Sequence, residues 1–185
     1  IREEGNSSER VSVMKLIQNA GQDRVIDLFK ARIQPGHQLA CASPALSLYA
    51  LAELSQPLAK LRKVQLILPS SNEQLELLGG ESDRAARNRL IARSLARRCH
   101  QWLNAKVELK RASSVIPQGI SLLRDAAGTP DQVVMGSFAL TTDGLGITPG
   151  NPMSLIQASE SPQEAAMFTP WFDNQWQTLN ARPRS

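Results

Sequence analysis

Hydrophobic residues recur along the chain with two different spacings, and the alternation of these spacings predicts a layered α/β domain. Apolar positions three and four apart predict helices, over Asp23–Ile33, Ala45–Leu61, Asp83–Asn104 and Pro162–Leu179. Short apolar or alternating runs predict strands, at Gln38–Ala42, Val64–Leu68, Lys106–Lys110, Gly119–Leu123, Gln132–Gly136 and Ser154–Ala158. This order favours a mixed β-sheet flanked by helices.

Local signals support some of these boundaries. Pro35-Gly36 follows the first helix, and residues of this kind end helices. Ser43 precedes Pro44 and is expected to cap the helix Ala45–Leu61, with the proline in the first turn, where its missing N–H costs nothing. In the strand Gln38–Ala42, Leu39 and Cys41 are expected to point to the same side of the sheet.

Length and composition narrow the class of protein. A chain of 185 residues with 42% hydrophobic and 21% charged residues is typical of one folded domain. We expect 1–13 to be a flexible leader, 14–180 a single domain, and 181–185 a linker or truncated boundary. No apolar run approaches the roughly 18 residues of a membrane span. Two cysteines cannot build a disulfide framework, which favours a reduced, cytoplasmic setting.

Charge is concentrated in one segment. The net charge is only +4, but Arg84–Arg111 contains nine basic residues and a single acid, Glu108. A local concentration of this kind is expected to meet phosphate or an acidic partner. The alternative interpretation is a solvated helix face, which is equally common.

A helical wheel separates two faces of the helix Asp83–Asn104. Ile91, Leu95, Cys99 and Trp102 share one side and are expected to face the core. Arg89, Arg93 and Arg97 lie on the opposite side, with no acid four residues away to pair with them. Together with Arg98 they are the candidate binding residues, for a nucleic-acid backbone or for a carboxylate of a larger protein.

The search for catalytic groups finds little. The chain has two histidines, His37 and His100, both expected to be structural or exposed to solvent. No His/Cys/Asp/Glu cluster has the spacing of a metal site, so no metal is expected. Gly79-Gly80 does not lead into Gly-Lys-Ser/Thr, and Gly144-Leu145-Gly146 lacks the third glycine of a dinucleotide site. No cofactor is expected.

A family resemblance lies in the second half of the chain. The stretch Val133–Gly146, with Gly136-Ser137-Phe138-Ala139-Leu140-Thr141 at its centre, resembles a segment of the phospholipase D superfamily. In its nuclease-like members an apolar strand runs into Gly-Ser-x-Asn-Leu-Thr, and a Gly-Leu turn follows. Met14–Asn19, Leu39–Ser43 and Ser47–Leu51 resemble the start of such domains. The similarity covers about Met14–Leu179.

The resemblance implies a phospholipase-D-like fold, and the departures imply that the chemistry is lost. Active members carry His-x-Lys on an upstream strand, where histidine attacks phosphorus and lysine and asparagine hold the phosphate oxygens. Here the His position falls at Pro117 or Gln118, the Lys position at Gly119 or Ile120, and the Asn position at Ala139. Gly136 and Ser137 remain and are interpreted as a tight exit from a strand. More narrowly, the chain resembles the degenerate N-terminal domain of large bacterial helicases of the restriction and phage-defence type.

Two classes of function follow from these observations. The first is an inactive module that binds the DNA backbone, or the rest of a helicase-type parent protein, where any ATP-dependent activity would reside. The alternative is an active phosphodiesterase with a rearranged site, in which His37 or His100 converges with Ser137, Thr141 or Thr142. A homodimer is also possible, because superfamily nucleases with one motif pair two copies. No membrane partner is expected.

Overall fold

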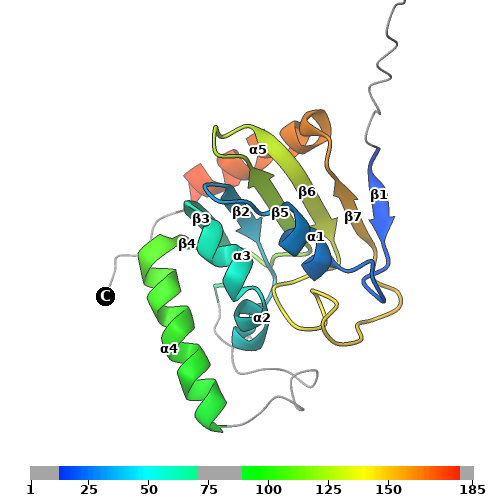
Figure 1. Cartoon of the computed structure of the whole chain (residues 1–185). Coiled ribbons are helices and arrows are strands. Elements are labelled where there is room, and N and C mark those ends of the chain that lie inside the picture. The colour runs from blue at the N-terminus through cyan, green and yellow to red at the C-terminus, as the bar shows by residue number, and fades with distance from the viewer. Residues whose placement is uncertain (1–12, 71–88, 180–185) are drawn as a thin grey trace, which may run out of the picture.

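The computed structural model describes residues 13–70 and 89–179, which form one seven-stranded sheet and five helices (Figure 1). The strands are β1 Lys15–Ile17, β2 Gln38–Ala42, β3 Lys63–Leu68, β4 Val107–Arg111, β5 Gly119–Arg124, β6 Pro130–Gly136 and β7 Ile156–Ser159. The helices are α1 Val25–Arg32, α2 Leu48–Glu53, α3 Ser55–Lys60, α4 Arg89–Lys106 and α5 Pro162–Thr178.

The sheet is mixed, as the sequence predicts. Its strand order is β1-β7-β6-β5-β2-β3-β4. Strands β2, β3 and β4 run parallel, whereas β5 pairs with β2 in the antiparallel sense, and β6, β7 and β1 continue antiparallel. The carboxyl ends of β2, β3 and β4 therefore share one edge of the sheet with the start of β5 and the end of β6.

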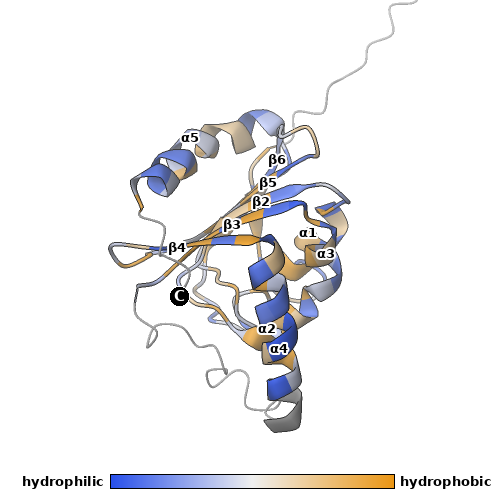
Figure 2. Cartoon of the chain, turned by 90° about the vertical axis from the view of Figure 1, so that its left-hand side faces the viewer, coloured by the Kyte–Doolittle hydropathy of each residue, from blue (hydrophilic) through white to orange (hydrophobic). Residues whose placement is uncertain are grey.

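Helices cover both faces of the sheet (Figure 2). Viewed edge-on, α5 lies alone on one side, and α1, α2, α3 and α4 lie on the other. Alternation along the strands supplies both cores: Leu39 and Cys41 of β2 join the core under α1–α4, while Ala40 and Ala42 join the core under α5. The prediction that Leu39 and Cys41 share a side is confirmed.

The predicted helix Ala45–Leu61 is wrong in its start and its continuity. The structure begins α2 at Leu48, with Ser47 in the N-cap position, and a break at Leu54 separates α2 from α3. Leu46 is instead drawn into a parallel bridge with Leu140. Pro57 lies in the first turn of α3 and has no N–H to bond to Glu53, so the helix cannot continue smoothly through the break.

Other element boundaries in the structure also differ from the predicted ones. Strand β1 was not predicted, because three residues are too few for a period to show. Helix α4 extends two residues beyond the predicted end at Asn104, and residues 83–88 of that prediction lie outside the described part of the chain. The predicted leader and final linker also lie outside it, apart from Val13.

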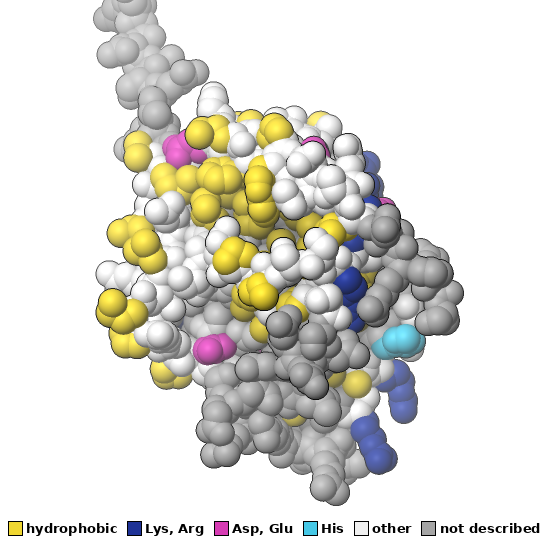
Figure 3. Space-filling model, turned by 180° about the vertical axis from the view of Figure 1, so that it is seen from behind, with side chains coloured by type: hydrophobic (Ala, Val, Ile, Leu, Met, Phe, Trp, Pro, Cys, Tyr) yellow, Lys and Arg dark blue, Asp and Glu magenta, His cyan; other side chains and the backbone are white. Residues whose placement is uncertain are grey.

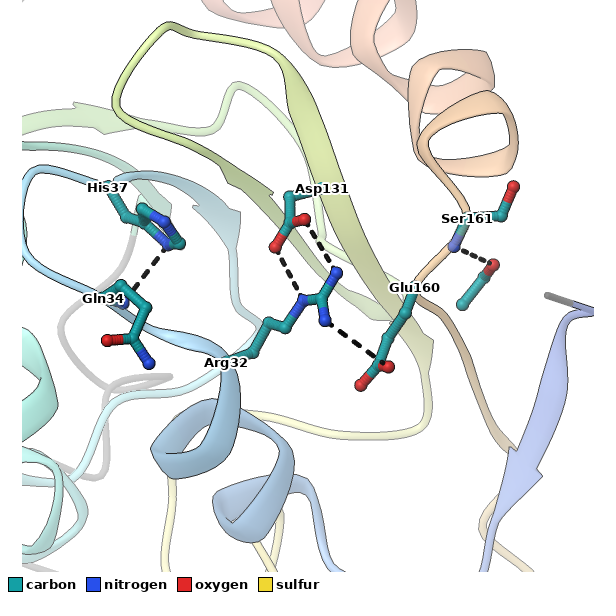
Figure 4. Close-up of polar contacts among 7 residues, drawn as sticks. Arg32, Gln34, His37, Asp131, Glu160 and Ser161 are labelled. Atoms are coloured by element: carbon teal, nitrogen blue, oxygen red, sulfur yellow. Dashed lines mark hydrogen bonds and ion pairs between the residues drawn. The ribbon is translucent and has the colours of Figure 1, made fainter. Parts of the chain in front are cut away.

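At the other end of the strands, near the start of β6 and the end of β7, a cluster of ion pairs connects α1 to the sheet (Figure 4). The Arg32 guanidinium at the end of α1 donates two hydrogen bonds of 2.8 Å to the Asp131 carboxylate of β6 and lies 3.8 Å from Glu160, which follows β7. The hydrogen bonds to Asp131 are the main reason that the pKa of Arg32 is raised. Ser161 then begins α5, where its hydroxyl accepts a bond from the Glu164 N–H.

Both cysteines lie in environments that disfavour the reactive thiolate form. Both are buried and free, and burial raises the pKa of Cys41 to about 12 and also raises that of Cys99. Within the described residues, no helix combines the length and apolarity that a membrane span requires.

We predict that both thiols react slowly in the folded protein. At pH 8.5 an unfolded cysteine is about half ionised, whereas Cys41, with a pKa of about 12, stays protonated, and burial lowers the ionised fraction of Cys99. A disulfide-exchange reagent should therefore leave Cys41 unlabelled in buffer, label Cys99 slowly, and label both in denaturant. Rapid labelling of Cys41 under native conditions would contradict the buried position of β2.

Candidate functional site

The positions singled out by the resemblance gather at the edge where the parallel strands end. Gln118 precedes β5 and is exposed, Gly136 closes β6, Ser137 is exposed, and Ala139 is partly buried in the next turn. The register places Gly119 opposite Gly136, so the two segments that carry the resemblance lie side by side.

Close backbone approach explains both glycines. A Cβ on Gly119 would lie 2.4 Å from the carbonyl oxygen of Phe138, and a Cβ on Gly136 would lie 2.1 Å from that of Leu155. Gly136 also has a φ of +128°, which other residues rarely adopt. The glycine of Gly136-Ser137 therefore has a structural function that is independent of any ligand.

Hydrogen bonds of Ser43 connect the end of β2 to the turn that follows β6 and contains Leu140. The Ser43 side chain is buried; the hydroxyl accepts a 2.9 Å hydrogen bond from the Leu140 N–H and donates a 2.6 Å bond to the Ala45 carbonyl. The Ser47 N–H donates to the Leu140 carbonyl at 2.8 Å. The bonds of Ser43 and Ser47 to Leu140 join residues 97 and 93 positions apart, and this role of Ser43 replaces the predicted helix cap.

The His, Lys and Asn of the superfamily motif are absent from the corresponding positions at this edge. Gln118 and Pro117 offer no imidazole, and Ala139 offers no amide for a phosphate oxygen. Both positions available for the lysine are closed: Gly119 lacks room for a side chain, and Ile120 is buried in the core under α5. The described residues also include no cluster of three metal-binding side chains.

The structure places His37 at the other end of β2 from this edge. His37 precedes β2, and five strand residues separate it from Ser43, a distance of about 15 Å or more. Its Nδ1 accepts a 3.3 Å bond from the Gln34 N–H (Figure 4). His100 is exposed on α4 and lies 3.0 Å from the Asn104 amide nitrogen. The Thr141 hydroxyl is already bonded to Asp143, and Thr142 is buried.

A pocket of about 190 Å³ opens beside Gln118. Its floor is formed by Ala42, Ile67 and Ala112, which lie at or just beyond the ends of β2, β3 and β4. Gln118 lines one side and Trp171 of α5 lines another. Ligands of open α/β sheets commonly bind at the carboxyl ends of parallel strands, which makes this pocket the candidate binding site.

Helix α4 presents the predicted arginines at the edge of the molecule. Arg93, Arg97 and Arg98 are exposed, and no other described residue forms an ion pair with them. Leu95 and Cys99 are buried, and Trp102 is half-buried. The backbone of α4 includes Arg89 and Ile91, but their side chains lie outside the description. In Figure 3, Lys and Arg side chains follow the right-hand edge, with acids sparse on this face.

Sequence reasoning missed Ser43 and Trp171 as parts of this edge. The tertiary bond of Ser43 has no local signature, because Ser43-Pro44 reads equally well as a helix start. Trp171 was assigned only to an amphipathic helix, and its exposure beside the strand ends follows from how α5 crosses the sheet.

We predict that Ser43→Ala lowers the free energy of unfolding by about 1–3 kcal/mol, because the Leu140 N–H is left buried without its acceptor. Ser113→Ala, at an exposed position near the same edge, should change it by less than about 0.5 kcal/mol. Denaturant unfolding measures both values. Equal stability of the two variants would contradict the fastening role of Ser43.

Comparisons with known proteins agree with this architecture. NucT from Helicobacter pylori superposes with a TM-score of 0.54 at 12% identity, covering 92% of this chain and 98% of NucT. The phospholipase D family member Nuc from Salmonella typhimurium superposes with a TM-score of 0.51 at 11% identity, covering 94% and 99%. TrmBL2, an archaeal chromatin protein, gives 0.48 at 11% identity; this chain spans 56% of its length.

Sequence comparison adds no assignment, since no protein-family model and no curated protein matches the chain. Identities of 11–12% with TM-scores above 0.5 establish the fold and nothing finer. The chain has a phospholipase-D-like fold.

Proposed function

We propose that this chain is a catalytically degenerate phospholipase-D-like domain that binds the DNA backbone through α4. The observation that carries the proposal is the exposed row of arginines, Arg93, Arg97 and Arg98, without acidic partners in the described structure. Like charges on consecutive turns repel one another, so the row is stabilised by an anionic partner. Phosphates spaced along a nucleic acid match a row of cations.

The position of α4 suits a long ligand. The helix is at the outer edge of the molecule beside β4, with its hydrophilic side turned outward (Figure 2). It carries no acidic residue from Arg89 to Lys106. A straight polyanion can follow such an edge without meeting the sheet or α5. Binding of this kind is expected to be weak, roughly 10⁻⁴–10⁻⁶ M, and insensitive to sequence.

The wider context belongs to the same proposal. The resemblance to degenerate domains of restriction and phage-defence helicases supports a parent protein in which this domain holds DNA, or another domain, for a linked motor. The protein-interaction part is supported by exposed apolar side chains, Leu16 and Leu155 among them. Figure 3 shows apolar side chains gathered on the back of the molecule. They are candidates for a contact with the parent protein or with a second copy of the chain.

We predict that Arg93→Gln/Arg97→Gln abolishes most DNA binding and reduces the slope of log K against log salt by about 2. Glutamine retains helix propensity, so the fold should be unchanged. Lys15→Gln/Lys30→Gln removes the same charge from exposed positions on β1 and α1 and is the matched control. Fluorescence anisotropy with a labelled duplex at several salt concentrations measures both slopes. Equal loss in both variants would reduce the effect to net charge, and no loss in either would reject α4 as the interface.

We also predict that the chain does not cleave DNA. His37 lies at the other end of β2 from this edge, and the motif positions hold no histidine or lysine. Incubation with single- and double-stranded DNA, with and without divalent metal, should leave both intact. Cleavage that is lost in His37→Ala or His100→Ala would favour the alternative, a rearranged phosphodiesterase site.

A further inference from the structure

We propose that the pocket beside Gln118 holds one unpaired nucleobase, stacked on Trp171, so that the domain favours single-stranded over duplex nucleic acid. This inference rests on the proposed function, because it extends the DNA backbone interaction to a base. It goes beyond it by naming a second contact, on the opposite side of the sheet from α4. We refer to this pocket as the Trp171 pocket.

The environment of Trp171 differs from that of the other tryptophan on α5. Trp176 stacks on Phe172, with ring centroids 6.1 Å apart, and the Lys110 ammonium lies 4.6 Å from its ring centroid. Trp171 is 45% exposed, and no other described residue makes a ring or cation contact with it. A large aromatic surface left open beside a pocket is available to stack on a ligand.

The size and chemistry of the Trp171 pocket fit a neutral ring with polar edges. An apolar cavity of about 150 Å³ accommodates benzene, so about 190 Å³ has room for a pyrimidine-sized ring. The floor is apolar, whereas Ser113, Gln118 and Gln175 on the walls supply hydroxyl and amide groups. Hydroxyls and amides both donate and accept, as the edges of a base require. None of the described residues that line the pocket is charged, which disfavours a phosphate as its occupant.

Access to such a pocket distinguishes the two forms of nucleic acid. Bases in a duplex are stacked and paired, so a pocket that takes up one base requires a single strand or an unstacked end. Stacking on an aromatic side chain depends little on sequence, because every base has a π-face. A cation row and a stacking platform are the two elements that single-strand binders combine.

A neutral nucleoside isolates the pocket from the phosphate interaction. Thymidine, which carries no phosphate, is titrated into the full chain at millimolar concentration while the three tryptophan indole N–H signals are followed by NMR. The signal of Trp171 should shift, and those of Trp102 and Trp176 should stay nearly fixed. Trp171→Ala removes the shifting signal and identifies it. No shift of the Trp171 signal would overturn the inference and leave the proposed function of α4 intact.

Oligonucleotides then test the preference for a single strand. Trp171→Ala should weaken binding of an eight-residue oligothymidylate about tenfold and leave duplex binding unchanged. Met167→Ala, which is 72% exposed one turn earlier on α5, is the matched control and should bind like the parent. Equal affinity of Trp171→Ala and Met167→Ala for the oligonucleotide would overturn the inference.

An exposed aromatic side chain can also form a contact between two protein molecules. Sedimentation of the parent protein and of each variant distinguishes such a contact from binding of a nucleobase. If the parent self-associates and Trp171→Ala alone abolishes that association, Trp171 belongs to a protein contact and the nucleobase inference fails. A separate failure of the proposed function would appear as undiminished duplex binding by Arg93→Gln/Arg97→Gln. The thymidine shift does not depend on that result, because thymidine has no charge for α4 to bind.

Discussion

The burial of β2 on both faces is the constraint on which the rest of the structure depends. Leu39, Ala40, Cys41 and Ala42 are all buried, and β2 pairs with a parallel strand on one side and an antiparallel strand on the other. Because the strand direction changes at β2, the ends of β2, β3 and β4 meet the start of β5 and the end of β6 at one edge. Every feature of the candidate site lies at or near that edge.

The two sides of the edge have different properties. On the α5 side, the described residues that line the Trp171 pocket carry no charge and combine apolar side chains with amide and hydroxyl groups. On the other side, α4 carries cations without acids. The separation follows from the positions of the two helices, since α4 and α5 lie on opposite faces of the sheet (Figure 2). A ligand with a charged backbone and neutral rings has the same division.

Sequence reasoning captured the features that depend on local periodicity. The mixed sheet, most of the strands and the two-sided character of α4 follow from spacing alone, as Leu95 and Cys99 against Arg93 and Arg97 illustrate. It failed where a tertiary contact overrides a local signal. Ser43 reads as a helix cap, but its hydroxyl is used by the Leu140 N–H, and no local pattern reports a partner 97 residues away. The need for glycine at 119 likewise arises from the Phe138 carbonyl, and the Trp171 pocket arises from how α5 crosses the strand ends.

The packing at Gly119 and Ile120 bears on the history of the site. If an ancestor held a lysine at either position, the present structure no longer has room for it. Gly119 has no space for a Cβ, and Ile120 is 4% exposed beneath α5. A lysine at 120 would bury an ammonium without a partner, which is among the costliest single substitutions. A lysine at either position would therefore destabilise the fold before it could contact a phosphate.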